Sequence, residues 1–219
     1  MCGRYTLTSD IETVAQTFHA MNTLAEGSPR YNIAPTQDIV AVMQDDTRHL
    51  DLLRWGLIPA WAKEESIGSK MINARAETLA EKPSFKRLLR GRRCLIVADG
   101  FYEWKAEGKG PKQPMYFSLQ QHEPFAFAGL WDSWKNPDGV VLRTCTIITT
   151  EANELVTPVH NRMPVILPLQ ACDAWLDPAL SDEHALLPLL KPYNAQDMLV
   201  RPVSRLVNDP KKEGPALLA

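Results

Sequence analysis

The feature that most constrains the fold is a series of short, apolar, strand-like segments separated by polar turns. Residues 38–44 and 49–55 are predicted strands, and the turn between them at Asp45, Asp46 and Thr47 indicates a hairpin. After a short N-terminal strand, further strands are predicted at residues 93–98, 101–105, 115–119, 125–131, 142–149 and 198–203. Helices are inserted between these hairpin-like runs, so we expect an α+β fold: curved, mostly antiparallel sheets forming a barrel-like core with peripheral helices.

The helical segments are few and short. Asp10 is placed to cap a helix whose apolar positions Ile11, Val14, Ala15 and Phe18 follow helical spacing. Other helices are predicted at residues 84–90, 151–156, 169–176 and 182–190. With 219 residues and no internal repeat or Gly/Ser linker, the chain is expected to form a single domain over residues 1–219. Residues 208–219 are expected to form a loose tail.

Charge and hydrophobicity exclude several classes of protein. A net charge of -2 argues against a protein that coats duplex DNA non-specifically, although the 24 Lys and Arg residues leave room for a local basic face. Its apolar runs fall short of the roughly 20 residues that a membrane span needs. The start of the sequence lacks the basic and apolar regions of a signal peptide. We expect a cytoplasmic protein with no membrane partner.

The four cysteines, Cys2, Cys94, Cys145 and Cys172, are widely scattered. They form no CxxC pair and have no histidine at metal-ligand spacing, so no metal site is expected. There is also no glycine loop of the Walker type, and no cofactor is expected. Three of the cysteines are interpreted as buried small apolar residues, whereas Cys2 differs because it directly follows the initiator methionine.

Removal of Met1, which a small second residue permits, would leave Cys2 with a free α-amine beside its thiol. Both groups are partly nucleophilic near neutral pH. The amine can condense with an aldehyde to a Schiff base, and the thiol can then close onto the same carbon to give a thiazolidine. Gly3 allows close approach of a substrate and Arg4 offers a planar cation for phosphate. The alternative is that Cys2 is only a small residue at the start of a strand.

The opening Met1-Cys2-Gly3-Arg4 resembles the start of the SRAP family, the SOS response-associated peptidases or abasic-site processing proteins. The resemblance extends in order over nearly the whole chain, which makes a chance match improbable. The further matching segments are Tyr31-Asn32-Ile33-Ala34-Pro35-Thr36, Trp55-Gly56-Leu57-Ile58-Pro59, residues 72–78 (INARAET), residues 98–105 (ADGFYEWK), residues 159–165 (VHNRMPV), Pro202-Val203-Ser204 and Val207-Asn208.

This resemblance implies a sensor that traps ring-opened abasic sites in single-stranded DNA as a thiazolidine and shields the lesion. It implies that Cys2 supplies both covalent atoms and that Asn73 hydrogen-bonds near the amine or the opened sugar. Glu103 would be the acid/base, and His160 would assist ring opening and reversal of the cross-link. Taken singly, these three residues also fit a helix cap, an exposed strand glutamate and a structural histidine.

DNA contacts are implied by the same segments. Arg4, Arg75 and Arg162 are candidate phosphate clamps, and Pro35 and Trp61 are candidates for contact with neighbouring bases. Family members often carry a second aromatic residue directly after the position of Trp61, where this chain has Ala62. Trp55 is expected in the core instead. The basic cluster Lys86, Arg87, Arg90, Arg92 and Arg93 either extends the basic surface or forms a solvated face.

Three alternatives remain at this point. An N-terminal-nucleophile amidohydrolase also begins with Cys-Gly but does not explain the ordered Asn73, Glu103 and His160 segments. The second alternative is a peptidase, whose activity could be limited to removal of its own Met1. The third is a non-catalytic binder of single-stranded DNA. The expected partners are single-stranded DNA with abasic sites and proteins of the replication fork. We expect a monomer, associated with the nucleoid when it is bound to DNA.

Overall fold

The computed structural model describes residues 2–108 and 110–219, so the predicted removal of Met1 lies outside the described residues. Its strands are β1 (Tyr5–Leu7), β2 (Arg30–Ile33), β3 (Asp38–Gln44), β4 (Arg48–Trp55), β5 (Asn73–Arg75), β6 (Arg93–Ala98), β7 (Gly100–Lys105), β8 (Gln113–Leu119), β9 (Phe125–Lys135), β10 (Val141–Glu151), β11 (Arg162–Pro164), β12 (Ile166–Leu167) and β13 (Met198–Pro202). The helices are α1 (Ile11–Thr17), α2 (Pro83–Gly91), α3 (Leu169–Leu176) and α4 (Glu183–Leu186). Short 3₁₀ turns are η1 (Glu65–Lys70), η2 (Ala76–Thr78), η3 (Leu187–Leu189), η4 (Ala195–Asp197), η5 (Arg205–Asn208) and η6 (Pro215–Leu218).

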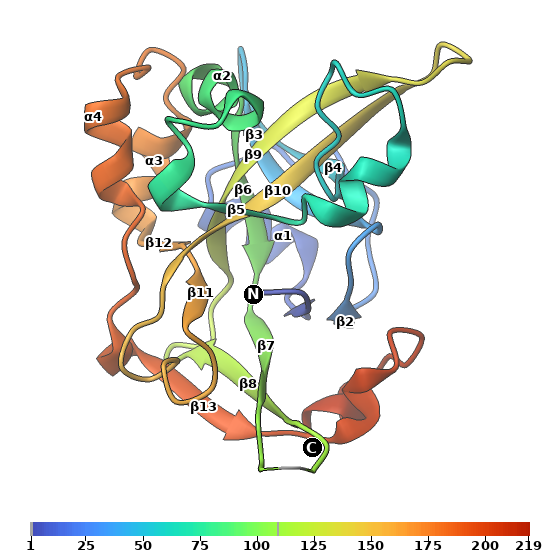
Figure 1. Cartoon of the computed structure of the whole chain (residues 1–219), viewed down its shortest axis with the longest axis vertical. Coiled ribbons are helices and arrows are strands. Elements are labelled where there is room, and N and C mark those ends of the chain that lie inside the picture. Colours follow the sequence, from blue (N-terminus) through green and yellow to red (C-terminus); the bar gives the residue numbers. More distant parts are fainter. Residues whose placement is uncertain (1, 109) are drawn as a thin grey trace.

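Five strands close into a barrel in the upper part of Figure 1. The order β10-β4-β3-β6-β9 returns to its start because β9 also pairs with β10. An odd number of strands cannot alternate in direction around a closed ring, so one pair must be parallel. That pair is β4 and β10, and the other four pairs are antiparallel. The predicted α+β fold with a barrel-like, mostly antiparallel core is confirmed.

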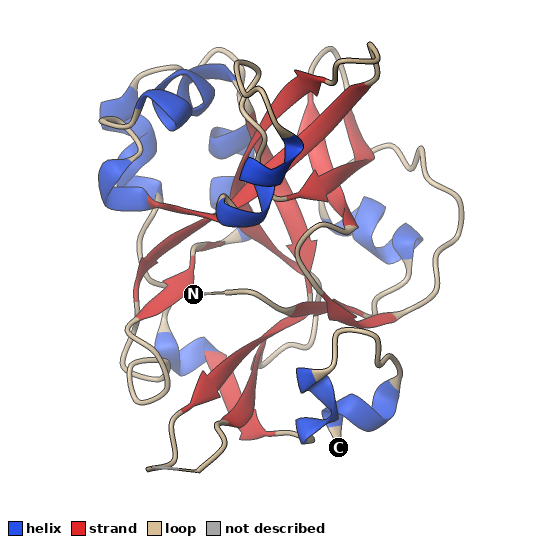
Figure 2. Ribbon diagram, turned by 45° about the vertical axis from the view of Figure 1, so that its right-hand side comes forward, coloured by secondary structure: helices blue, strands red, loops and turns tan. Residues whose placement is uncertain are grey.

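A second sheet of five strands lies below the barrel in the order β13-β8-β7-β1-β2. The chain passes from one sheet to the other at Asp99, between β6 of the barrel and β7. In Figures 1 and 2 the segment that leads into β1 runs between the barrel and this second sheet. The N-terminal residues are therefore enclosed by the two layers.

Asp99 anchors the first strand at this crossing. Its buried carboxylate accepts hydrogen bonds from the Thr6 hydroxyl, from the backbone N–H and hydroxyl of Thr8, and from the backbone N–H of Ser9 at 3.0 Å. Charge-assisted bonds of this kind are stronger than neutral ones. They hold β1 in register against β7.

The core fills the barrel and the space beneath it. Tyr5 contacts Trp55 and Phe127 in edge-to-face geometry, with ring centroids 5.4 and 5.8 Å apart. Trp55 is fully buried, as predicted, and its indole N–H donates to the carbonyl of Ile72 at 2.9 Å. The predicted burial of Cys94, Cys145 and Cys172 is also confirmed.

The helices cover the outside of the barrel, with α2, α3 and α4 grouped on one flank in Figure 1. Asp10 caps α1 as predicted, accepting from the backbone N–H of Thr13 at 2.8 Å. Among the described residues, every helix is too short or too polar to cross a membrane.

The helix predicted at residues 151–156 is wrong. β10 runs through Glu151, and residues 154–159 form turns. The physical reason is Asn153, whose Oδ1 accepts from the backbone N–H groups of Leu155 and Val156 at 3.1 and 3.0 Å. Such a side chain competes with helical hydrogen bonding, and Pro158 lacks the N–H that a helix would need. The result is a compact loop that ends at His160.

Arg93 does not belong to a solvated basic face. Its side chain, 6% exposed, donates to the carbonyls of Trp175 and Asp177 at the C-terminal end of α3, and to those of Leu89 in α2 and Leu180. The last carbonyls of a helix have no partner within the helix, and a cation there also suits the helix dipole. This one residue attaches two helices to the barrel.

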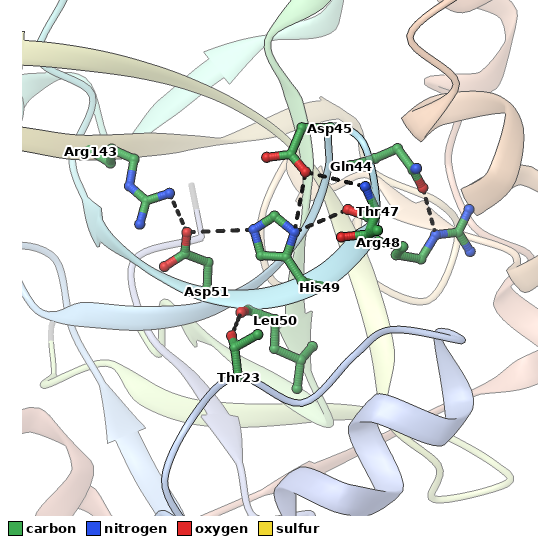
Figure 3. Close-up of polar contacts among 9 residues, drawn as sticks. All are labelled: Thr23, Gln44, Asp45, Thr47, Arg48, His49, Leu50, Asp51 and Arg143. Atoms are coloured by element: carbon green, nitrogen blue, oxygen red, sulfur yellow. Dashed lines mark hydrogen bonds and ion pairs between the residues drawn. The ribbon is translucent and has the colours of Figure 1, made fainter.

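Polar contacts tie the β3–β4 hairpin to the rest of the barrel (Figure 3). The ring of His49 lies between Asp45 and Asp51, with N···O distances of 3.6 and 3.9 Å, and Arg143 of β10 pairs with Asp51. Thr23 donates its hydroxyl to the carbonyl of Leu50. The ion pair between Arg143 and Asp51 links β10 to β4 across the parallel pair.

The C-terminal segment, predicted as a loose tail, is held against the second sheet. The buried amide of Asn32 donates to the carbonyls of Asp209 and Lys212, both at 2.9 Å. Leu217 is buried, and the carbonyl of Ala219 accepts from the backbone N–H of Ser204 at 3.0 Å. These contacts are distant in sequence, and composition alone does not reveal them.

Candidate functional site

Cys2 lies at the centre of the molecule, between the two sheets. Tyr5 pairs with Phe101, and the N–H of Tyr102 donates to the carbonyl of Arg4 at 3.0 Å, so the antiparallel register continues toward the N-terminus. Cys2 is 0% exposed. Burial raises the pKa of its thiol well above the ordinary value, and the negative charge of the nearby Glu103 raises it further. The thiol is therefore protonated at neutral pH.

Glu103 is the buried carboxylate beside this thiol. It is on β7 and 4% exposed. Continuing the register of β1 and β7 places it opposite Gly3. An exposed strand glutamate, the alternative for this residue, is excluded by its burial.

Asn73 contacts Cys2 directly. Its Nδ2 donates to the carbonyl of Cys2 at 2.9 Å. Oδ1 of the same amide is buried and has no hydrogen-bond partner among the described residues. The pairing of β5 with β10, in which Asn73 lies opposite Ile147, fixes the position of this amide. It therefore holds the main chain of Cys2 while its carbonyl oxygen can still accept a donor.

His160 lines an open pocket together with Arg75, Asn161 and Arg162, with a volume of about 470 Å³. The histidine ends the loop that follows β10. Arg75 is exposed and lies two residues from Asn73 on β5, so this strand connects the pocket with Cys2. Thus Cys2, Asn73 and Glu103 lie together, and the pocket with His160 adjoins them through β5.

Arg162 is tied to the protein rather than directed freely to solvent. Its Nη1 and Nη2 donate to the two carboxylate oxygens of Glu77 at 2.6 and 2.9 Å, and Nη2 donates also to the carbonyl of Thr149 at 2.7 Å. Its side chain is 15% exposed, against 51% for Glu77. The hydrogen bonds from Arg162 hold the pKa of Glu77 below its usual range. Of the two arginines at the pocket, Arg75 is the exposed one.

Arg4 faces the C-terminal segment. Its Nη1 donates to Oδ1 of Asn32 at 2.6 Å and to the carbonyl of Val207 at 2.7 Å. Its guanidinium lies 6.0 Å from the ring centre of Trp104, whose indole N–H donates to Asn208 at 2.7 Å. The three candidate phosphate clamps are therefore separated: Arg75 and Arg162 line the pocket, and Arg4 braces the strand that carries Cys2.

The two candidates for base contact lie on separate loops. Pro35 follows β2 and is partly exposed. Trp61 is 65% exposed and borders a different pocket of about 430 Å³, together with Ala62, Lys63 and Lys70. An indole exposed to this extent is unusual for a core residue and suits stacking on a flat partner.

Sequence reasoning missed three residues that build this site: Asn32, Glu77 and Asp99. Each lies inside one of the matching segments, but its own type gave no functional signal. Their partners are distant in sequence: Asn32 contacts Arg4 and Asp209, and Glu77 contacts Arg162. In the described part of the chain, no group of three or more His, Cys, Asp or Glu residues could hold a metal ion.

The sequence is similar to those of known proteins. The model of the family described as SOS response associated peptidase (SRAP) matches residues 1–210. The abasic site processing protein YoqW of Bacillus subtilis (strain 168) is 50% identical over 221 residues, covering 100% of this chain and 99% of that protein. The abasic site processing protein HMCES of Gallus gallus is 37% identical over 190 residues, covering 76% of this chain and 56% of that protein.

Solved structures agree in fold. The crystal structure of a protein from Bacteroides thetaiotaomicron superposes with a TM-score of 0.90 at 27% sequence identity, covering 99% of this chain and 98% of that one. A protein from Bordetella bronchiseptica superposes with a TM-score of 0.81, also at 27% identity, covering 93% of this chain and 100% of that one.

Proposed function

Because the chain belongs to the SOS response associated peptidase (SRAP) family, we propose that it processes abasic sites in DNA, as the names of its curated relatives state for them. More specifically, Cys2 captures the ring-opened sugar of an abasic site in single-stranded DNA as a thiazolidine. The observation that carries this proposal is the buried Cys2, held at its carbonyl by Asn73, with the carboxylate of Glu103 beside its thiol.

The proposed reaction starts at the α-amine of Cys2, which exists once Met1 has been removed. The amine nitrogen adds to the C1′ aldehyde of the opened sugar and forms a carbinolamine. Loss of water from the carbinolamine gives a Schiff base. The sulfur then bonds to C1′ of the protonated Schiff base, the π electron pair of the C=N bond moves to nitrogen, and the thiol proton is taken up by a base. This completes the five-membered ring with no bond to the DNA backbone broken.

Glu103 is suited to both proton transfers of this sequence. As an acid it protonates the hydroxyl that leaves the carbinolamine as water, and as a carboxylate it accepts the proton of the thiol. The raised pKa of Cys2 makes such a base necessary, since the thiol does not ionise by itself near neutral pH. Oδ1 of Asn73, which has no hydrogen-bond partner within the described ranges, supports a further role: it can accept from the amine of Cys2, so that the lone pair of the amine nitrogen is directed at the aldehyde.

Two residues of the His160 pocket, and Trp61 outside it, have further roles in the proposed reaction. His160 assists opening of the sugar ring and, later, reversal of the cross-link. Arg75 is the exposed cation placed to contact a phosphate, and the exposed Trp61 can stack on a base. Such contacts position a strand without reading its sequence.

The deciding experiment is denaturing gel analysis of the full chain with abasic and intact single-stranded oligonucleotides. We expect a complex that survives denaturation with the abasic strand only, and an intact mass that shows loss of Met1. Equal retention on both strands with no denaturation-resistant species would contradict the proposal and favour a simple binder. Hydrolysis of glutamine or of unrelated peptides, without a DNA adduct, would favour the amidohydrolase or peptidase alternatives.

Glu103→Gln should slow formation of the cross-link by about 100-fold, the lower range of the contribution of general acid–base groups. The amide has the size of the carboxylate, so the folded structure should be retained. The reaction slows because the amide cannot donate or accept the proton that is transferred. The rate is followed by quenched time points on the same gels. Glu107→Gln, an exposed neighbour that pairs with Arg205, is the matched control and should react like the wild type. An unchanged rate in Glu103→Gln would remove it from the mechanism.

A further inference from the structure

The main chain of Arg162 contacts Nδ1 of His160 with both its nitrogen and its carbonyl oxygen. Nδ1 of His160 lies 3.0 Å from the backbone nitrogen of Arg162 and 3.2 Å from its carbonyl oxygen. The N–H can only donate and the carbonyl can only accept. One residue thus offers Nδ1 a partner in either of its protonation states.

The shorter of the two contacts indicates the resting tautomer. When Nδ1 accepts from the N–H of Arg162, the neutral ring carries its proton on Nε2. When Nδ1 is protonated, it can donate to the carbonyl of Arg162 without rotation of the ring. Nε2 is then the atom that exchanges a proton with the substrate. It gives up a proton when it acts as an acid and accepts one when it acts as a base.

This arrangement requires the main chain of Arg162 to stay in place, and the side chain of Arg162 secures it. Glu77, in the turn η2 that follows β5, accepts hydrogen bonds from both terminal nitrogens of Arg162. The carbonyl of Thr149 in β10 accepts a third hydrogen bond from Arg162. Two parallel bonds between a guanidinium and a carboxylate restrict orientation as well as distance. The ion pair therefore joins the histidine loop to the segment that carries Asn73 and Arg75.

We propose that Glu77 is a positioning residue, which through Arg162 keeps a main-chain partner at Nδ1 of His160 in both protonation states. The expected effect of Glu77 on proton transfer to the sugar and on release of the cross-link rests on the proposed function, whereas the expected tautomer of His160 does not. In ring opening, the sugar oxygen takes the proton from Nε2 of the charged ring as its bond to C1′ breaks. The C1′ hydroxyl loses its proton to water, and the electron pair of that O–H bond forms the C=O bond of the aldehyde. The electron pair of the N–H bond stays on Nε2, and Nδ1–H remains bonded to the carbonyl of Arg162. Arg75 and Arg162 line the same pocket as the ring, and Glu77 pairs with Arg162.

The tautomer can be measured by nitrogen NMR on the full chain with ¹⁵N-labelled histidine at alkaline pH, where the imidazoles are neutral. His160→Gln identifies the resonances. We expect the Nε2–H tautomer for His160 in the wild type and a mixture of both tautomers in Glu77→Gln. Glu151→Gln, which removes an exposed carboxylate from β10 without touching the ion pair, should match the wild type. A wild-type Nδ1–H tautomer, or an unaltered spectrum in Glu77→Gln, would overturn the proposal.

The second measurement is transfer of the cross-link to a competing abasic oligonucleotide. We expect about 10-fold slower release in Glu77→Gln, the scale of loss when a group that orients a functional histidine is removed. Glu77→Asp should recover part of the rate. If Glu77→Gln instead only tightens retention on intact single strands, Glu77 is a competitor of phosphate for Arg162 and the positioning role is wrong. If the wild type forms no adduct, the proposed function fails while the tautomer result stands.

Discussion

Replacement of Cys2 by alanine is expected to abolish the denaturation-resistant complex with abasic single-stranded DNA. Alanine keeps the α-amine, so a Schiff base can still form, but without sulfur the thiazolidine ring cannot close. A Schiff base is hydrolysed during denaturation unless it is first reduced with borohydride. The gel therefore should show no complex for Cys2→Ala without borohydride and a trapped one with it.

Cys2→Ser separates the two nucleophiles further. Its hydroxyl is a much poorer nucleophile than a thiol, so we expect mainly the reducible Schiff base. Cys172→Ala is the control, since it removes another buried thiol from α3, outside the site. Full yield and equal stability of the adduct in Cys2→Ala would exclude the thiazolidine. Circular dichroism of each variant checks that the exchange at position 2 leaves the fold intact.

Replacement of Arg93 is expected to have the largest effect on stability. Arg93→Met preserves most of the side-chain volume but leaves the carbonyls of Leu89, Trp175, Asp177 and Leu180 without their donor. A buried acceptor without a partner costs about 1–3 kcal/mol, and relaxation of the helix ends recovers part of the sum. We expect a loss of about 3–5 kcal/mol in the free energy of unfolding, or roughly 10 °C in Tm.

The matched control for Arg93 is Arg90→Met on the same helix. Arg90 is 54% exposed and pairs with Glu183, so its loss should change the free energy of unfolding by less than about 1 kcal/mol. Urea unfolding followed by tryptophan fluorescence compares the three proteins. A free energy of unfolding of Arg93→Met within about 1 kcal/mol of the wild type would show that these carbonyls find other partners.

The type and position of most elements follow from local sequence. Alternating apolar residues predict the β3–β4 hairpin, and Asp10 predicts the start of α1. The error at residues 151–156 has a local cause as well, since Asn153 binds the N–H groups that a helix would use. The short strands β2, β5, β11 and β12 were not predicted, because segments of two to four residues carry little periodicity.

For the candidate site as well, the sequence indicated some features and only the structure revealed others. The proposed chemistry of Cys2 follows from its position next to Met1, and the resemblance of ordered motifs to the family pointed to Asn73, Glu103 and His160. Their roles stay proposals until the gels and spectra test them. What motifs do not contain is the geometry: that Arg162 is committed to Glu77, and that Arg4 braces the C-terminal segment.

The sequence by itself therefore determined most of the longer strands and helices, and which residues carry reactive groups, since both depend on neighbours along the chain. Only the tertiary structure decided which arginine is exposed at the pocket, which residue is buried beside the thiol, and which partners Nδ1 of His160 meets. These outcomes depend on strand pairings between β1 and β7, β5 and β10, and β10 and β11, whose contacts join residues far apart in sequence.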